Sequence, residues 1–231
     1  MTNEPKAPAK RTPGNRAGLN RERVLDTALA LADRDGVRAL TMRRLGDELG
    51  VEAMTLYHYV ANKDALLDGL VERVFARAMA HAEQQAARAA ETEHADAWRE
   101  LLAAYASALR TALLRHPGVL PLATTRPAVT PATLDVVEST LGALTSAGFP
   151  LARAVDALNA LTVFVIGHAS AEAAIAPAPD SPGSAAWLAD LDPARYPLLT
   201  KAAREGAGTD DEQRFTFAVD ALLTGYTTAK A

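Results

Sequence analysis

Apolar residues recur along this 231-residue chain every three or four positions, which is the spacing of amphipathic helices. No long run of the sequence alternates apolar with polar residues as a half-buried strand does. We expect helices over 20–35, 62–90, 95–115, 132–147, 151–175 and 212–227. The pattern therefore predicts an all-α fold.

The most distinctive stretch is residues 41–63, where two short amphipathic segments meet at Gly50. Each segment carries two apolar residues four positions apart on one helical face: Leu45 with Leu49, and Leu56 with Val60. Gly50 adopts the left-handed conformation at little cost and so ends the first helix. Two short helices joined in this way are typical of a helix-turn-helix.

The second segment, which we expect to be helical to about Val60, carries Tyr57, His58 and Tyr59 in succession. Successive residues lie about 100° apart around a helix, so these three rings cannot all face the core beside Leu56 and Val60. At least two rings are therefore predicted to be exposed. Exposed aromatic and hydroxyl groups beside cations suit a helix in the major groove of DNA, and the alternative is a surface helix pair with no nucleic-acid partner.

Two kinds of side chain in this stretch are suited to DNA. Phosphates are expected to bind the tyrosine hydroxyls, Thr41 and Lys63. Base edges are expected to be read by Arg43, Ala53, Met54, Thr55 and His58.

The net charge of −4 is unevenly distributed along the chain. Residues 1–64 hold 11 Lys or Arg against 9 Asp or Glu, whereas residues 65–231 hold 13 against 19. Residues 1–18 contain three prolines and two glycines and are expected to form a disordered basic arm, which either touches DNA or is a solvated tail. We therefore divide the chain into this arm, a DNA-binding head at 19–64 and a helical body at 65–231.

The body contains a nearly apolar helix, because the fifteen residues between Asp156 and Glu172 include no charged side chain. Such a helix must be covered on most sides. We expect it to be too short and too interrupted by polar residues to cross a membrane, and we find no apolar run long enough to do so. A two-fold interface shared with the last helix would cover it. We expect this homodimer interface to include Phe164, His168, Val219, Leu222 and Tyr226.

The motifs of common enzyme classes are missing from the sequence. There are no cysteines, and the five histidines form no i, i+4 pair and no HExxH motif. A nucleophile elbow and a glycine-rich phosphate loop are also missing. We therefore expect no catalysis, metal or cofactor, and the alternatives to a regulator are an enzyme and an architectural DNA-binding protein without an effector. The lack of cysteine and of an N-terminal apolar signal segment fits a cytoplasmic protein.

The stretch LTMRRLGDELGVEAMTLYHYVANKDALLDGL is similar, at nearly every position, to the N-terminal helix-turn-helix of TetR-family transcriptional regulators. Its most specific part is T-L-Y followed by N-K and L-L. The body resembles the tetracycline repressor subgroup through LLRHPG, TRP, SAGF and YPLL. The resemblance covers residues 20–228, and it implies a helix-turn-helix head on a larger helical body that binds an effector and forms a dimer.

This resemblance also implies the residues of two sites. The implied DNA contacts are Thr41, Met42, Arg43, Ala53, Met54, Thr55, Tyr57, His58, Tyr59 and Lys63. The implied effector-binding residues are Tyr105, Leu109, Thr125, Arg126, Pro127, Val137, Thr140, Val155, Leu158 and Asn159.

Arg126 precedes a proline and is therefore expected in an extended conformation. Its guanidinium either points into a cavity or reaches a surface carboxylate. Where the tetracycline repressors place a metal-binding histidine this chain has Leu122, and at or beside their acidic position it has Ala171. We therefore do not expect magnesium–tetracycline as the effector, but a mostly apolar molecule oriented by Tyr105, Arg126 and Asn159.

Together these features predict a ligand-responsive transcriptional repressor. We expect it to bind a palindromic operator in double-stranded DNA as a homodimer, with its recognition helices in successive major grooves. A small effector bound by the body is expected to release it from DNA. Repression, rather than activation, is implied by the resemblance alone.

Overall fold

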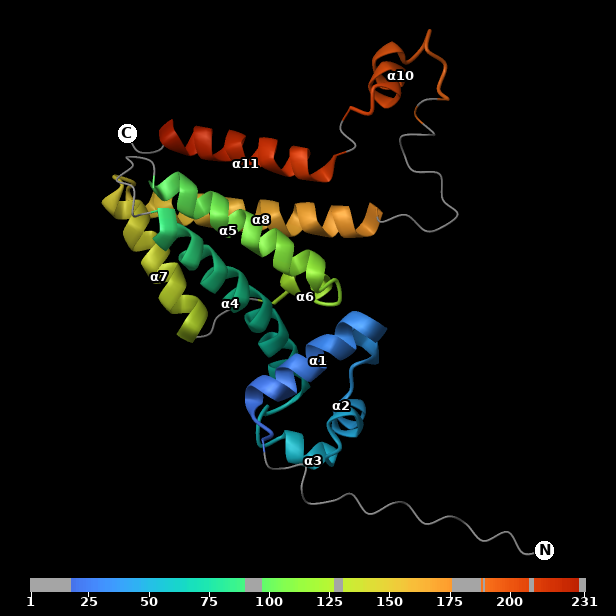
Figure 1. Ribbon diagram of the computed structural model, residues 1–231, viewed down its shortest axis with the longest axis vertical. Coiled ribbons are helices and arrows are strands. Elements are labelled where there is room, and N and C mark those ends of the chain that lie inside the picture. The colour runs from blue at the N-terminus through green and yellow to red at the C-terminus, as the bar shows by residue number, and fades with distance from the viewer. Residues whose placement is uncertain are drawn as a thin grey trace, which may run out of the picture. The chain divides into compact units, whose positions relative to one another are not determined.

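The structure is a computed structural model that describes residues 18–89, 97–126, 131–175, 188, 190–207 and 210–228. Every regular element of these residues is a helix, which confirms the predicted all-α fold (Figure 1). The longer helices are α1 (Arg21–Asp35), α4 (Lys63–Ala89), α5 (Ala97–Arg115), α7 (Pro131–Ser146), α8 (Leu151–Ile175) and α11 (Asp211–Thr227). The shorter helices are η2 (Val37–Ala39), α2 (Met42–Leu49), α3 (Ala53–Leu56), α6 (Leu120–Ala123) and α10 (Pro197–Arg204). The predicted N-terminal arm lies outside the described residues except for Gly18.

The ends of the helices coincide with capping residues in the sequence. Asn20, Thr41 and Asp210 each accept a hydrogen bond from the backbone N–H three positions later, at the starts of α1, α2 and α11. Gly36 and Gly50 end α1 and α2 with φ angles of 80° and 68°. The observed long helices agree with the predicted ones to within one or two residues at each described end.

Contacts along the chain divide it into two compact units. The first unit joins the residues up to Val74 with His116–Ala128, and the second joins Phe75–Arg115 with Val129–Ala231. The division falls within α4, which contributes to both units. It differs from the predicted boundary after residue 64, because the first turns of α4 pack on α1 and the segment after α5 belongs to the first unit.

In the first unit, α1 packs closely against the beginning of α4. The side chains of Leu25 on α1 and Leu66 on α4 are both buried. A Cβ atom on Gly69 would lie 2.6 Å from the side chain of Leu25, so the glycine permits the close approach. Arg73 of α4 also forms an ion pair with Asp26 of α1, with 2.7 Å between Nη2 and Oδ2. These contacts hold the two helices in a fixed orientation.

The segment after α5 is fixed to the end of α1 within the same unit. His116 Nδ1 lies 2.7 Å from Asp33 Oδ2, and the backbone N–H of Gly118 donates to Asp33 Oδ1 at 3.3 Å. A Cβ atom on Gly118 would lie 2.4 Å from the carbonyl oxygen of Ala32, so only glycine fits there. The short helix α6 follows, with Pro121 in its first turn, where proline is tolerated.

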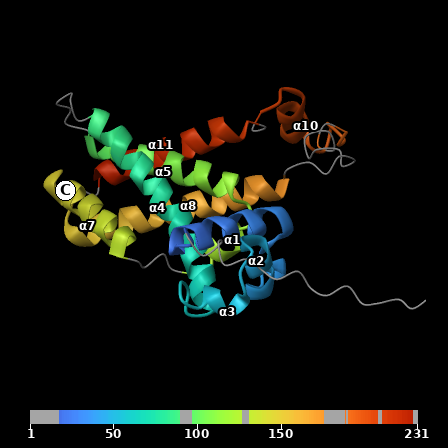
Figure 2. The same cartoon turned by 60° about the horizontal axis from the view of Figure 1, so that its bottom comes forward.

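The core of the second unit lies among α5, α7, α8 and α11, and Figures 1 and 2 show α5, α8 and α11 side by side. Leu109 on α5 is fully buried. At the start of α5, Arg99 donates to the carbonyl oxygen of Leu223 on α11 at 3.0 Å, while Trp98 packs edge-on against Phe149. The loop between α7 and α8 is thereby tied to the start of α5.

By length and composition alone, α8 could cross a membrane, over Leu151–Ala174. The expectation that the chain has no apolar run of that length was therefore wrong. The core helix of a soluble protein passes the same test, and 33% of the apolar 18-residue window within this stretch is buried within the chain. Its packing against α5, α7 and α11 explains the buried part. Its remaining faces are available for another partner.

Candidate nucleic-acid interface

The two helices of the helix-turn-helix meet through a tight turn. Thr41 Oγ1 accepts a hydrogen bond from the backbone N–H of Arg44 at 3.2 Å and caps α2. After Gly50 the chain reverses, and Val51 is buried with 5% of its surface exposed. Val51 therefore fills the space between α2 and α3.

Gly46 makes this close approach possible. A Cβ atom on Gly46 would lie 2.8 Å from the carbonyl oxygen of Val51 and 3.2 Å from the backbone nitrogen of Ala53. Any larger side chain would push α3 away from α2, because both nearby atoms belong to the backbone. Sequence reasoning missed this residue, although a glycine in the middle of a short helix is unfavourable and so signals a packing requirement.

The regular part of α3 ends at Leu56, four residues before the predicted end near Val60. The backbone N–H groups of His58 and Tyr59 bond to carbonyl groups three residues earlier, at 3.3 and 2.9 Å. The last turn is therefore tighter than an α-helix, which is common at helix ends. Asn62 then caps α4 by accepting from the N–H of Ala65 at 2.8 Å.

Most of the predicted DNA contacts have accessible side chains. Leu45, Leu56 and Val60 occupy the core, with 0 to 4% of their surfaces exposed. Among the predicted contacts, the exposed side chains are Thr41, Arg43, Met54, Tyr57, His58 and Lys63, and the half-buried ones are Ala53, Thr55 and Tyr59. Two exposed rings confirm the prediction made from the spacing. Met42 is buried with 9% exposed, so its side chain faces the core.

The two arginines of α2 differ in their partners. Arg44 lies 2.7 Å from Asp35 at the end of α1, and Arg34 pairs with the same carboxylate and with Glu48. These hydrogen bonds and charges raise the pKa of Arg34. Within the described residues, Arg43 forms no ion pair, so its guanidinium is available to a partner outside the chain.

The predicted effector-binding residues fall in both units. In the second unit Tyr105, Leu109, Thr140 and Leu158 are buried, Val137 is half-buried, and Val155 and Asn159 are exposed. Tyr105 Oη lies 2.8 Å from Thr162 Oγ1, and burial raises the pKa of the Tyr105 hydroxyl. Pro127 lies outside the described residues. The buried members are therefore two leucines and two residues with hydroxyl groups, Tyr105 and Thr140.

Thr125 and Arg126 belong to the first unit, where Thr125 is exposed. The guanidinium of Arg126 reaches the carboxylates of Asp64 and Asp68 on α4, at 2.7 and 2.6 Å. The sequence left open whether this guanidinium points into a cavity or reaches a surface carboxylate. In the structure it binds surface carboxylates. Sequence reasoning could not name the partners, because they lie about sixty residues away.

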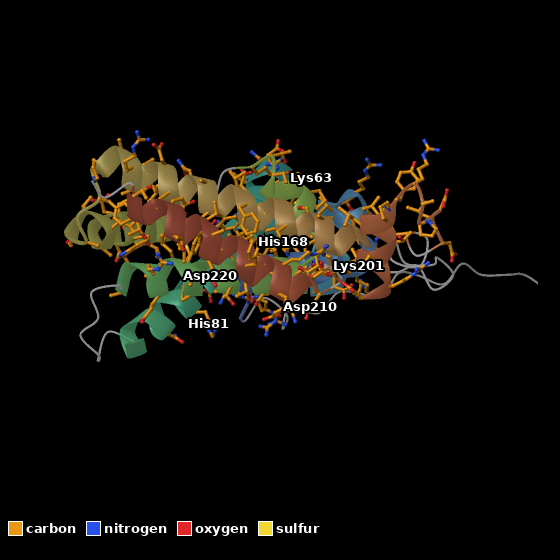
Figure 3. The ribbon with its side chains drawn as sticks, turned by 90° about the horizontal axis from the view of Figure 1, so that it is seen from above. Lys63, His81, His168, Lys201, Asp210 and Asp220 are labelled. Carbon is orange, nitrogen blue, oxygen red and sulfur yellow. The ribbon has the colours of Figure 1, made fainter. Side chains whose placement is uncertain are left out.

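A charged cluster that the sequence did not indicate lies in the second unit. Arg110 of α5 lies 2.8 Å from Glu172 of α8, and its guanidinium sits over the ring of Phe215. His168, labelled in Figure 3, lies 3.7 Å from Glu172 and packs against Phe215. Burial lowers the pKa of His168; Glu172 opposes this shift, while Arg110 adds to it.

The predicted dimer residues mostly face into their own chain. Phe164 stacks on Phe215 with ring centroids 5.8 Å apart, and Val219 is buried with 5% exposed. The most exposed apolar side chains on α8 and α11 are instead Val163 and Phe217, at 71% and 76%. The same outward stripe continues through the small exposed residues Ala160, Gly167, Ala171, Ala174, Ala221 and Gly225.

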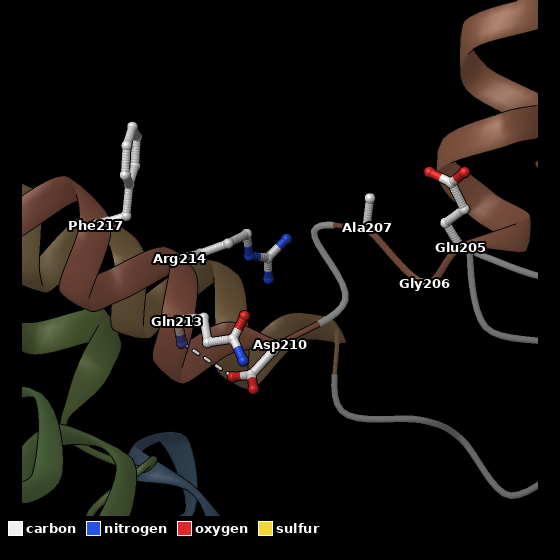
Figure 4. Close-up of a pocket in the computed structure, with 7 residues that line it drawn as sticks. All are labelled: Glu205, Gly206, Ala207, Asp210, Gln213, Arg214 and Phe217. Atoms are coloured by element: carbon white, nitrogen blue, oxygen red, sulfur yellow. Dashed lines mark hydrogen bonds between the residues drawn. The ribbon is translucent and has the colours of Figure 1, made fainter.

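An open hollow of about 380 Å³ lies between the end of α10 and the beginning of α11. Figure 4 shows the residues that line it. It is lined by Glu205, Gly206, Ala207, Asp210, Gln213, Arg214 and Phe217. None of the predicted effector-binding residues contributes to it. The hollow is therefore distinct from the predicted effector site.

A helix-turn-helix with an accessible polar and aromatic face, joined to a larger helical unit, defines a DNA-binding regulator. Residues 24–70 match the family "Bacterial regulatory proteins, tetR family". Residues 90–229 match "Tetracyclin repressor-like, C-terminal domain". The chain belongs to the TetR family of transcriptional regulators, which have a DNA-binding head and a ligand-binding C-terminal domain and are not enzymes.

Individual relatives agree with this assignment. Tetracycline repressor protein class D of Escherichia coli is 34% identical over 215 residues, which cover 91% of this chain and 90% of the relative. An HTH-type transcriptional regulator of Saccharopolyspora erythraea is 37% identical over 154 residues, which cover 67% of this chain but only 61% of that protein. The crystal structure of apo ActR from Streptomyces coelicolor has a TM-score of 0.74 at 25% identity, covering 92% of this chain and 96% of ActR.

Proposed function

We propose that the protein is a homodimeric repressor that binds a palindromic operator and leaves it when a small, mostly apolar molecule binds to the body. The observation that carries this proposal is the accessible face of the helix-turn-helix. There Arg43, Met54, Tyr57 and His58 are exposed while their apolar neighbours are buried. Such a face offers a cation, rings and a methyl-bearing side chain to base edges.

Direct base reading is assigned to Arg43, Ala53, Met54, Thr55 and His58, and phosphate contacts to Thr41, Tyr57, Tyr59 and Lys63. Met42, which is buried, is assigned the role of supporting the start of α2 from the core. Because only Arg43 offers a guanidinium without an ion pair in the described part of this face, it is the main base contact. We expect few direct base contacts in each half-site.

The dimer is proposed to form along the outward stripe of α8 and α11. Val163 and Phe217 provide large exposed apolar surfaces that a monomer would leave in water. Gly167 and Gly225 have open space beside them, so a second helix can approach closely there. Two helices from each subunit would form a four-helix interface around a two-fold axis. The predicted residues Phe164, His168, Val219, Leu222 and Tyr226 then support this face from behind.

The effector is proposed to contact the body through buried apolar side chains and a few polar groups. Leu109 and Leu158 provide apolar surface, and Tyr105 and Thr140 provide hydroxyls. A role for Arg126 requires an effector group that replaces its two carboxylate partners. Magnesium–tetracycline is not proposed, since Leu122 is buried and offers no metal ligand.

We place the protein in the cytoplasm, where its DNA target lies and where its bacterial relatives act as regulators. The competing proposal is an architectural DNA-binding protein, which would bind all sequences with similar affinity.

Selection of bound sequences from random duplexes tests the proposal. Enrichment of an inverted repeat with half-sites about 34–36 Å apart, or a multiple of that spacing, is expected. A screen for small molecules that release the enriched duplex would then identify the effector. Recovery of unenriched sequences would refute the regulator and favour the architectural alternative.

A further inference from the structure

Arg126 holds two carboxylates at the beginning of α4. Its Nη2 lies 2.7 Å from Asp64 Oδ1, and its Nη1 lies 2.6 Å from Asp68 Oδ1. Nη1 also donates to the backbone carbonyl of Asp64 at 3.3 Å. All three residues belong to the first unit, which also contains the helix-turn-helix. The arginine therefore bridges the loop after α6 to the first two turns of α4.

The position of these carboxylates matters because Asp64 directly follows Lys63, the proposed phosphate contact. The side chains of Asp64 and Asp68 are 79% and 54% exposed, whereas that of Arg126 is 23% exposed. A carboxylate repels a DNA phosphate, and the repulsion extends over about 8–10 Å at physiological ionic strength. Two unpaired carboxylates at this position would therefore oppose the approach of α4 to the DNA backbone.

We propose that Arg126 is a positioning residue for DNA binding, which offsets one of the two negative charges of Asp64 and Asp68 and keeps the start of α4 compatible with phosphate. This inference rests on the proposed function and extends it. Arg126 need not touch DNA, since its effect passes through the two aspartates. A group that withdraws Arg126 from these aspartates weakens DNA binding through charge alone.

The geometry favours this role over a purely structural one. A planar guanidinium can serve two carboxylates at once, and here each Nη atom contacts a different aspartate. Exposed ion pairs add little to folding stability, so removing this one should leave the fold intact. Losing the guanidinium should still weaken DNA binding, because the protein surface next to the phosphates becomes more negative.

The test measures the affinity of the full-length protein for a random-sequence duplex at several salt concentrations. It compares the variant Arg126→Ala, the double variant Asp64→Asn/Asp68→Asn and the triple variant that combines all three substitutions. We expect Arg126→Ala to weaken binding about three- to tenfold at low salt and to reduce the salt slope by about 1. The triple variant should bind at least as tightly as the unaltered protein, because the carboxylates are gone. Arg153→Ala, which removes the same charge from an exposed ion pair on α8, is the control and should have a smaller effect.

Two results would overturn the proposal. One is unchanged affinity of Arg126→Ala, and the other is a triple variant as weak as Arg126→Ala, which would assign the loss to structure instead of charge. A random duplex needs no operator, so this outcome is separate from the sequence selection that tests the proposed function. Unaltered protein that fails to bind any duplex would refute the proposed function itself.

Discussion

At the scale of single residues, Arg43 and Arg44 are adjacent in α2 but have different surroundings. Arg43 is exposed without an ion pair among the described residues, whereas Arg44 is held by Asp35. We expect Arg43→Ala to weaken binding to the selected duplex by about 1–3 kcal/mol and to relax the preference at one base pair. Lys63→Ala should instead weaken all duplexes and lower the salt slope by about 1. Equal losses for Arg43→Ala on selected and random duplexes would exclude base reading.

Asp35 restrains Arg44 through the 2.7 Å ion pair and also pairs with Arg34. Asp35→Asn should free Arg44 to bind phosphate, so we expect tighter binding to random duplexes and a salt slope steeper by about 1. Affinity measured at several salt concentrations gives both values. Adding Arg44→Ala to Asp35→Asn should cancel the gain in affinity. If the double variant keeps the gain, a cation other than Arg44 is responsible for it.

At the scale of helices, the contact between α2 and α3 depends on the missing side chain of Gly46. Gly46→Ala should lower the free energy of unfolding by about 1–3 kcal/mol, because the new Cβ meets backbone atoms at 2.8 and 3.2 Å. Thermal unfolding measures this change. Gly142→Ala, in a helix with nothing within 4 Å of the new Cβ, should be neutral or stabilising by up to about 1 kcal/mol. Similar losses at both glycines would contradict the packing argument.

The packing of α8 against α5 and α11 should depend on pH through His168. Burial lowers the pKa of this side chain, Glu172 opposes the shift, and Arg110 and Arg214 add to it. The unfolded chain therefore binds the proton more readily, so His168 contributes stability above about pH 6.5 that is lost as the pH falls through its folded pKa. His168→Gln should reduce the fall in melting temperature between pH 7.5 and 5.5. His81 is exposed, and His81→Gln serves as the control. If the melting temperature of His168→Gln falls as much as that of the control, His168 is excluded as the source of the pH dependence.

At the scale of the whole molecule, the proposed dimer buries the stripe around Val163 and Phe217. Val163→Asp or Phe217→Asp should give monomers in sedimentation, because a charge would be placed in an apolar interface. Leu134→Asp changes an exposed leucine on α7 and should leave the dimer intact. A dimer that persists in both stripe variants would place the interface elsewhere.

Sequence predicted the features that depend on neighbouring residues. The end of α2 at Gly50 depends on the conformation of a single residue, and the structure has it where expected. The pairing of Arg110 with Glu172 and of Arg126 with Asp68 could not be predicted, because each partner lies about sixty residues away and depends on tertiary packing. An almost wholly apolar α8 gives no periodic signal for its outer face, so the sequence did not indicate that Val163 is the most exposed large side chain of this helix.

The central claim is that two helix-turn-helix heads read one operator together. The most direct measurement compares the affinity of the dimer for the selected duplex with that for a duplex whose half-sites lie about five base pairs, half a helical turn, farther apart. We predict that the longer duplex binds only as tightly as a single half-site, because the second head then faces the wrong side of the DNA. Equal affinity for both spacings would contradict the claim.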